Sequence, residues 1–298
     1  MSKLKMMVVL LLVAAFGACA TMTPDLPSIT ESPTGNRMSG KIVWHDLLTN
    51  TPAESRKFYE DLFGWKFEKP GIDIGFGEES SYMLIRHNGH LIGGMVDTNA
   101  LGKKENISQW VTMISVADIE AAVDRVTTEG GKILTAPKQL KTRGILSIVE
   151  DPTGAIVALI QTKDGDPADR EPEHNDFLWD ELWTSDVERA GNFYSQVAGY
   201  RREDRAPGDG KVNYHLLVSA EKPRAGILQN PFGDVPPVWV NYLRVEDPSA
   251  ITARVEALGG TILLDTQTRN IGAETAFIAD PSGAGIALQT WPLKQDKD

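Results

Sequence analysis

The chain has 298 residues, of which 41% are hydrophobic and 24% charged, a composition typical of globular proteins rather than fibrous or disordered ones. Its 41 acidic residues outnumber its 30 basic residues and give a net charge of −11, so we expect no nucleic-acid partner and no attraction to anionic lipid without an anchor. The single cysteine, Cys19, excludes a disulfide framework, a cysteine-rich zinc site and an iron–sulfur cluster.

The amino-terminal segment has the pattern of an export signal. Lys3 and Lys5 precede an apolar run over residues 6–16, which is too short for a membrane span of about 20 residues. Small residues follow the run, as they do at signal-peptide cleavage sites. We therefore predict that residues 1–18 are a signal peptide and take no part in the fold.

Two cleavage sites fit this signal. Gly17-Ala18-Cys19 resembles a bacterial lipobox, which predicts a lipid on Cys19 and a membrane-anchored lipoprotein in the periplasm or at the cell surface. Cleavage after Ala20 is the alternative and predicts a secreted, soluble protein. Residues 19–40, rich in Thr, Pro and Ser, are predicted to be a flexible tether between the anchor and the first domain.

The rest of the chain repeats itself. Residues 43–50 read VWHDLLTN, and residues 178–185 read LWDELWTS. The later landmarks are paired in the same order: Phe58-Tyr59 with Phe193-Tyr194, Gly64-Trp65 with Gly199-Tyr200, Trp110 with Trp239, Gly130-Gly131 with Gly259-Gly260, and Asp151-Pro152 with Asp280-Pro281. The repeat predicts two tandem domains, 41–161 and 177–293, joined by a polar linker over 162–176.

Hydrophobic periodicity predicts the same elements twice within the first domain. The first set is a strand over 41–49, a helix over 52–63, and strands over 65–68, 82–87 and 91–96. The second set is a strand over 109–116, a helix over 118–128, and strands over 132–135, 145–149 and 156–160. The order is therefore βαβββ, twice in each domain and four times in the chain.

This order resembles the vicinal oxygen chelate superfamily, which contains glyoxalase I, extradiol dioxygenases and bleomycin-resistance proteins. The Phe-Tyr pairs, Gly64, Gly199 and the closing Asp-Pro-x-Gly-Ala motifs at 151–155 and 280–284 carry the resemblance. It implies an α+β fold of two tandem domains, each a pair of βαβββ modules that form one curved half-barrel sheet. The chain looks most like a two-domain, glyoxalase-like subgroup.

The resemblance also implies where a metal would bind. In metal-using members, His, Gln or Glu from the first strand of each module and Glu from the last strand hold one divalent ion. The matching positions are Trp44, Val111 and Ala158 in the first domain and Trp179, Val240 and Ala287 in the second. None of these side chains can ligate a cation, so we expect neither the usual metal nor another cofactor. His45 lies one residue from a ligand position, but its copy is Asp180, and we interpret His45 as a hydrogen-bonded structural residue.

Strict alternation of strand side chains places aromatic residues and one acid on the inner face of each sheet. The predicted ligand-binding residues are Trp44, Asp46, Leu48, Met113 and Ser115 in the first domain, and Trp179, Glu181, Trp183, Tyr242 and Arg244 in the second. Such a wall is typical of small-molecule sites, and tryptophan can stack on a planar or cationic ligand. The alternative is a filled core in which the acid pairs with an internal arginine such as Arg244.

Three functions remain open from the sequence. The leading hypothesis is an exported protein that binds a small aromatic or cationic molecule without a metal. The second is a lyase, isomerase or oxygenase with an atypical site, for which Asp46 and Glu181 are the candidate acids, because burial would favour a carboxyl able to act as a general base. The third is a structural or interaction module with both sites filled. Neither the ligand nor the oligomeric state follows from the sequence.

Overall fold

The computed structural model of the chain describes residues 26–70, 81–101, 106–205, 214–233, 235–269 and 272–291. The predicted signal peptide, Cys19 and the first part of the predicted tether lie outside the described residues. Within those ranges, no helix combines the length and the apolar composition needed to cross a membrane.

Domain 1 contains one eight-stranded sheet with the strand order β2-β3-β4-β1-β5-β8-β7-β6. Its first module comprises β1 (Ile42–Thr49), α3 (Pro52–Phe63), β2 (Lys66–Glu68), β3 (Tyr82–His87) and β4 (His90–Asp97), followed by the 3-10 helix η1 (Thr98–Leu101). Its second module comprises β5 (Gln109–Ser115), α4 (Ile119–Thr128), β6 (Lys132–Leu140), β7 (Gly144–Glu150) and β8 (Ile156–Thr162). Because β1 and β5 are antiparallel neighbours, the two modules share one continuous sheet.

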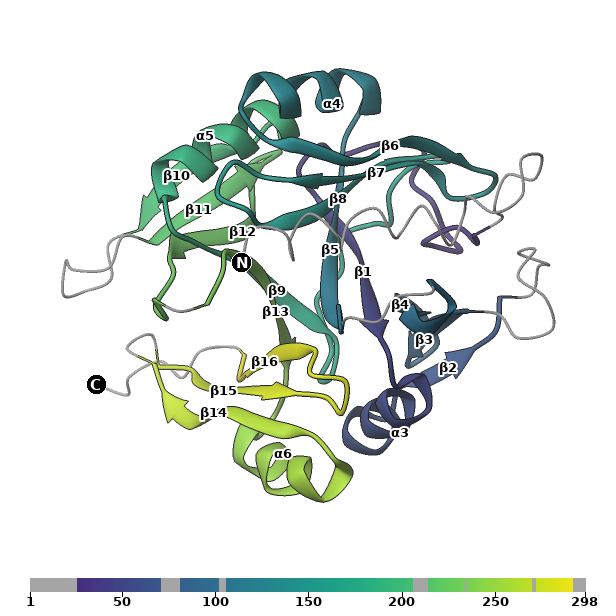
Figure 1. Cartoon of the computed structure of the whole chain (residues 1–298), viewed down its shortest axis with the longest axis vertical. Coiled ribbons are helices and arrows are strands. Elements are labelled where there is room, and N and C mark those ends of the chain that lie inside the picture. Colours follow the sequence, from purple (N-terminus) through teal and green to yellow (C-terminus); the bar gives the residue numbers. More distant parts are fainter. Residues whose placement is uncertain are drawn as a thin grey trace.

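Domain 2 repeats this topology in the order β10-β11-β12-β9-β13-β16-β15-β14. Its first module comprises β9 (Phe177–Thr184), α5 (Val187–Ala198), β10 (Arg201–Arg205), β11 (Tyr214–Ser219) and β12 (Lys222–Gln229). Its second module comprises β13 (Val238–Arg244), α6 (Pro248–Val255), the 3-10 helix η2 (Glu256–Leu258), β14 (Thr261–Thr268), β15 (Glu274–Ala279) and β16 (Gly285–Gln289). The predicted α+β fold of tandem domains with curved, open sheets is confirmed (Figure 1).

Local sequence signals set the helix ends. Pro52 occupies the first turn of α3, where its missing N–H and fixed φ cost nothing. Gly64 ends α3 in the left-handed conformation, with φ of 71°, which glycine adopts without strain. The carboxylates of Asp118 and Asp186 cap the first turns of α4 and α5. These signals explain why the predicted helix boundaries lie within a residue of the observed ones.

The repeated landmarks join the two domains to each other. Helix α4 packs against α5, and α3 packs against α6 (Figure 1). Gly131 of domain 1 lies against Phe193 of domain 2, so that a Cβ at Gly131 would stand 2.7 Å from the phenyl ring. Gly260 of domain 2 receives Phe58 of domain 1 in the same way, at 2.5 Å. Each double glycine therefore makes room for the phenylalanine of the other domain.

The tyrosine of each Phe-Tyr pair is also part of the structural core. Trp110 Nε1 donates to Tyr59 Oη at 3.0 Å, and Trp239 Nε1 donates to Tyr194 Oη at 2.9 Å. Tyr194 in turn donates to Asp151 Oδ2 at 3.2 Å, across the domain boundary. Burial raises the pKa of both tyrosines, which therefore remain protonated donors.

A buried polar network lies between the domains, where equivalent residues of the two copies face each other. His45 Nε2 donates to Asp180 Oδ1 at 2.9 Å, and these two residues occupy equivalent positions of the repeat. Asn241 Nδ2 donates to Asp180 Oδ1 at 2.5 Å and to Thr112 Oγ1 at 2.7 Å, and Thr112 and Asn241 are also equivalent. The interpretation of His45 as a hydrogen-bonded structural residue is confirmed.

Residues 26–40 differ from the flexible tether that their composition predicts. Leu26 and Ile29 are each only 3% exposed and belong to the core of domain 1. Thr34 donates its backbone N–H to Asp166 O at 3.0 Å, and Pro33 forms an isolated bridge with Pro167. The physical reason is that Leu26 and Ile29 bury apolar side chains against the inner face of the sheet, which composition alone does not show.

Candidate functional site

The inner face of domain 1 carries a cluster formed by Trp44, Asp46, Tyr82 and Arg143, which we call the domain 1 cluster. Strand β1 supplies Trp44 and Asp46, whereas Tyr82 begins β3 and Arg143 precedes β7. Asp46 Oδ1 accepts hydrogen bonds from Trp44 Nε1 and Tyr82 Oη, both at 2.8 Å. Arg143 Nη2 donates to Tyr82 Oη at 3.0 Å, and its guanidinium lies 5.0 Å from the centre of the Trp44 ring. Both carboxylate oxygens of Asp46 therefore face a partner: Oδ1 accepts the two hydrogen bonds, and Oδ2 lies 3.9 Å from Arg143 Nη1.

The amino-terminal segment closes this cluster from solvent. Arg143 Nε donates to the carbonyl of Pro27 at 3.0 Å, and Leu26 and Ile29 pack into the same apolar core as Trp44. The Arg143 side chain is 0% exposed. The inner face of domain 1 is therefore filled by the chain itself.

The inner face of domain 2 carries the equivalent arrangement, which we call the domain 2 cluster: Trp179, Glu181, Trp183, Tyr214, Tyr242 and Arg269. Glu181 accepts three hydrogen bonds, from Tyr214 Oη at 3.0 Å, Trp183 Nε1 at 3.2 Å and Tyr242 Oη at 2.6 Å. Trp179 Nε1 donates to Tyr214 Oη at 2.9 Å. Arg269 Nη1 lies 3.7 Å from Glu181 Oε1, which is the counterpart of the Arg143–Asp46 pair.

The side chains of the two clusters differ in how far they are exposed to solvent. The Arg269 side chain is 30% exposed, whereas Arg143 is fully buried. Trp179 and Tyr214 are only partly buried, whereas Trp44 and Tyr82 are buried. The cover over the domain 2 cluster is smaller than that formed by residues 26–29: Phe232, itself 39% exposed, lies with its ring centre 5.6 Å from that of Trp183. The domain 2 cluster is therefore less enclosed than the domain 1 cluster, at Arg269, Trp179 and Tyr214, while Trp183, Glu181 and Tyr242 are buried.

The tyrosines of both clusters act as hydrogen-bond donors. Burial raises the pKa of Tyr82, with the nearby Arg143 opposing the shift. Burial and then the charge of Glu181 raise the pKa of Tyr214 and of Tyr242 well above the usual range. These phenols stay protonated at ordinary pH and point their protons at the carboxylates.

Two glycines make room for these phenols. Gly94 on β4 pairs with Asp46, and a Cβ at Gly94 would lie 1.9 Å from Tyr82 Oη. Gly226 on β12 pairs with Glu181, and a Cβ there would lie 2.1 Å from Tyr214 Oη. The absence of a side chain at these positions allows the phenol to reach the acid on the neighbouring strand.

The structure brings together most of the predicted ligand-binding residues. Leu48 and Met113 line the inner face of domain 1 beside Trp44. Ser115 and Arg244 do not join the clusters, because segments outside the sheets bind them. Ser115 Oγ donates to Asp166 Oδ1 at 2.9 Å, while Arg244 donates to the carbonyls of Trp291 and Pro172. The internal arginine that pairs with Glu181 is Arg269 and not Arg244.

The sequence interpretation predicted Tyr242 but missed the other residues that complete the clusters: Tyr82, Tyr214, Arg143 and Arg269. A signal for each is present in the repeat. Tyr-x-Leu begins β3 at Tyr82 and β11 at Tyr214, and a Thr-Arg pair ends at Arg143 in domain 1 and at Arg269 in domain 2. These motifs are only two or three residues long, and their spacing from the acids differs between the two copies. They are therefore recognised only after the structure shows that their side chains contact the acids.

The clusters do not fit a divalent metal. Each offers one carboxylate, whose oxygens already accept hydrogen bonds or face an arginine. Across the part of the chain that the structure describes, no group of three or more His, Cys, Asp or Glu side chains is placed to hold a metal ion. A phenol and a guanidinium stand beside each acid, and both are hydrogen-bond donors rather than ligands.

Comparison with known proteins decides the family. A sequence profile of the Glyoxalase/Bleomycin resistance protein/Dioxygenase superfamily matches residues 41–159 and 177–288. The chain belongs to this superfamily. Its two matched segments correspond to the two eight-stranded sheets, so each domain is a complete superfamily domain.

Relatives within the superfamily span nearly the same length. The chain is 29% identical over 241 residues to CFP32 of Mycobacterium tuberculosis, named provisionally as a glyoxylase, covering 81% of this chain and 91% of the relative. It is 27% identical over 261 residues to the anthracycline biosynthesis protein DauV of Streptomyces sp. strain C5, covering 84% and 92%.

Solved superfamily structures share the fold. A Mn(II)-bound glyoxalase from Novosphingobium aromaticivorans superposes with a TM-score of 0.57 at 16% identity, covering 85% of this chain and 83% of that one. An extradiol ring-cleaving dioxygenase from B. fuscum superposes with a TM-score of 0.55 at 16% identity, covering 90% and 77%. At this identity the likeness concerns the fold alone.

Proposed function

We propose that this superfamily member is a binding protein that takes a small, planar aromatic molecule on the inner face of domain 2, without a divalent metal. The observation that carries the proposal is the difference in exposure between Arg269 and Arg143: of two equivalent clusters, only that of domain 2 has its arginine partly open to solvent. The wall of domain 2 joins Trp179 and Trp183 to several polar groups, as small-molecule sites do.

The charges of the domain 2 cluster favour an aromatic ligand over a cationic one. Glu181 is already neutralised by Arg269 and accepts hydrogen bonds from three side chains. A cation would have to displace that arginine, which stands at the exposed side. An aromatic ring that displaces the exposed Phe232 can instead stack on Trp183 while its substituents meet Arg269. The relatives named for anthracycline biosynthesis support a polycyclic aromatic ligand.

Truncation of Trp183 tests the site. In a chelator-treated protein, we expect calorimetry with planar aromatic probes such as anthraquinones to show saturable binding that Trp183→Ala weakens by about tenfold or more, because a stacking surface is lost. Leu48→Ala changes the equivalent position of the closed domain 1 and should leave the affinity unchanged. Equal losses for both variants, or affinity that requires added metal, would refute the proposal.

We also propose export, as the amino-terminal pattern predicts, with Cys19 carrying a lipid that anchors the protein to a membrane. The basic start, the short apolar run and the cysteine after Gly17-Ala18 support it. Mass spectrometry of the protein purified from membranes should find a diacylglyceryl group on Cys19. A free amino terminus at Thr21 would instead support secretion of a soluble form.

A further inference from the structure

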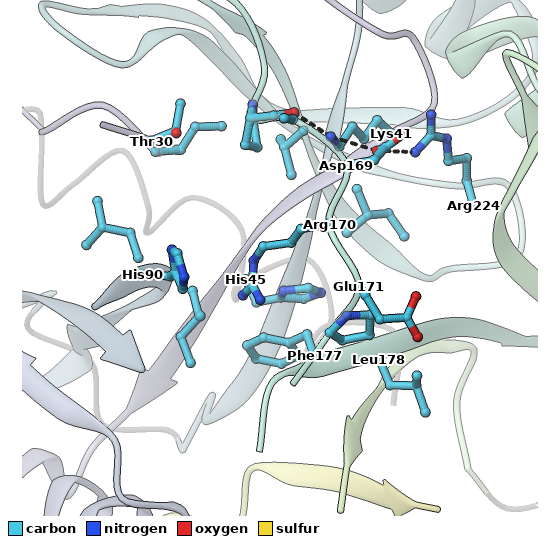
Figure 2. Close-up of a pocket in the computed structure, with 18 of the residues that line it drawn as sticks. Thr30, Lys41, His45, His90, Asp169, Arg170, Glu171, Phe177, Leu178 and Arg224 are labelled. Carbon is cyan, nitrogen blue, oxygen red and sulfur yellow. Dashed lines mark hydrogen bonds and ion pairs between the residues drawn. The ribbon is translucent and has the colours of Figure 1, made fainter. Parts of the chain in front are cut away.

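A second candidate site lies between the domains; Trp179 is the one member of the two clusters that also lines it. It is a pocket of about 740 Å³ formed where the first residues of β1, β9 and β12 approach the linker between the domains. Figure 2 shows Lys41, Asp169 and Arg224 at one end of the pocket, with His45 and Phe177 farther along it. Neither the family fold nor the proposed aromatic site assigns a role to this pocket.

Three cations converge on one carboxylate at that end. Asp169 of the linker is paired with Lys41 at 2.8 Å, Lys222 at 2.8 Å and Arg224 at 2.7 Å. Although burial alone would raise the pKa of Asp169, the hydrogen bonds from these cations hold it far below its usual range. We call Lys41, Lys222 and Arg224 the cation cluster.

The cation cluster is short of negative charge. Asp166 is the next carboxylate: its charge opposes the effect of burial on the pKa of Lys41, and it accepts hydrogen bonds from Ser115 Oγ at 2.9 Å, Thr162 Oγ1 at 2.9 Å and the Met38 N–H at 2.6 Å. Two further carboxylates of the pocket, Glu31 and Glu171, face Arg86 and Arg244 instead. Among the described residues, Asp169 is the only carboxylate paired directly with these cations. Three cations thus face two carboxylates, Asp169 and Asp166, and a local excess of positive charge persists in a chain whose net charge is −11.

Burial makes this excess costly. The side chain of Lys41 is 8% exposed and that of Arg224 is 9% exposed. Burial lowers the pKa of Lys41, against the opposing effect of Asp169. Arg224 Nε is buried and has no hydrogen-bond partner among the described residues. Buried cations are stable only when anions and acceptors satisfy them, so the cluster has capacity for a further acceptor.

The rest of the pocket suits an apolar body attached to that acceptor. Phe177 stacks on His45 with ring centres 3.8 Å apart, and Ile42 and Leu91 add aliphatic surface. Asp169 reaches the cation cluster from the linker, and the head group of a ligand would join the cluster beside its carboxylate.

We propose that this pocket binds a small organic anion, a carboxylate or a phosphate ester, whose head group joins the cation cluster at Arg224 and Lys222. The head group completes the charge of the cluster, and the apolar part lies along the pocket toward Phe177. Arginine and lysine are the usual partners of carboxylates and phosphates, and arginine can bind them through two parallel hydrogen bonds.

Calorimetry and thermal melting with benzoate and with inorganic phosphate test this site, against chloride at matched ionic strength. We expect saturable binding of at least one of the two anions, weakened about tenfold or more by Arg224→Gln. Arg201→Gln removes an exposed arginine that pairs with Glu203 and Glu221 and should leave the affinity unchanged. Stabilisation no greater than that of chloride, or equal losses in both variants, would overturn the proposal.

Asp169→Asn provides a second test that does not depend on losing a cation. Without the charge of Asp169, the three cations repel one another, so the variant should melt at a lower temperature than the wild type. The anion should bind the variant more tightly and raise its melting temperature again. If Asp169→Asn binds the anion no more tightly than the wild type, the head group does not contact the cations that Asp169 pairs with, and the proposal fails. Trp183→Ala should not change anion binding, which separates this site from the aromatic one.

Discussion

Asp180→Ala is expected to lower the free energy of unfolding by about 3–5 kcal/mol, since it removes the acceptor at the centre of a buried network. Asp180 is 5% exposed and accepts from His45 Nε2 at 2.9 Å and from Asn241 Nδ2 at 2.5 Å. In the alanine variant both donors lose the carboxylate that satisfies them at a buried position. Urea unfolding followed by fluorescence measures the loss.

A similar pair at the surface is the matched control. His215 Nδ1 lies 2.6 Å from Asp204 Oδ1, but the Asp204 side chain is 82% exposed. Asp204→Ala should therefore change the stability by no more than about 0.5 kcal/mol, because solvent screens the pair and replaces the acceptor. A comparable loss in the two variants would show that the network between the domains is not the source of the effect.

Gly94→Ala is expected to lower the free energy of unfolding by about 3 kcal/mol, because the added methyl group has no space. Its Cβ would lie 1.9 Å from Tyr82 Oη and 2.4 Å from Asp46 Oδ1. The phenol would have to leave the acid, and the hydrogen bonds of the domain 1 cluster would break. Thermal and urea unfolding measure the change.

Two further variants identify the clash as the cause. Gly233→Ala adds a methyl group where nothing lies within 4 Å and should be nearly neutral. In Tyr82→Ala the obstructing ring is absent, so Gly94→Ala should cost less in that background than in the wild type. Additive losses in the double variant would contradict the position of Tyr82 over Gly94.

Much of the fold followed from the sequence because its signals are local or repeated. Pro52 and Gly64 bound α3 at the predicted residues, and the periodicity of residues 42–49 placed Trp44 and Asp46 on the inner face. The landmarks that carry the family resemblance are themselves structural, since Phe58 and Phe193 hold the domains together and touch neither acid.

The completed site did not follow from the sequence, because its parts come from distant strands. Tyr82 and Arg143 are separated by 61 residues and meet only when β3 and the turn before β7 face the same side of the sheet. The alternation of strand side chains placed Ser115 on the same inner face. It could not show that the Ser115 hydroxyl donates its hydrogen bond to Asp166 of the linker. Nor does composition reveal that Leu26 and Ile29 fill the inner face of domain 1.

The pairing of His45 with Asp180 has a consequence for assembly from separate halves. These residues are equivalent in the repeat and face each other where the domains meet. Two copies of domain 1 docked in this way would oppose two imidazoles, and two copies of domain 2 would oppose two buried carboxylates, which repel each other. The pairing of unlike halves therefore gives each buried group its partner, and a second copy of domain 2 cannot take the place of domain 1.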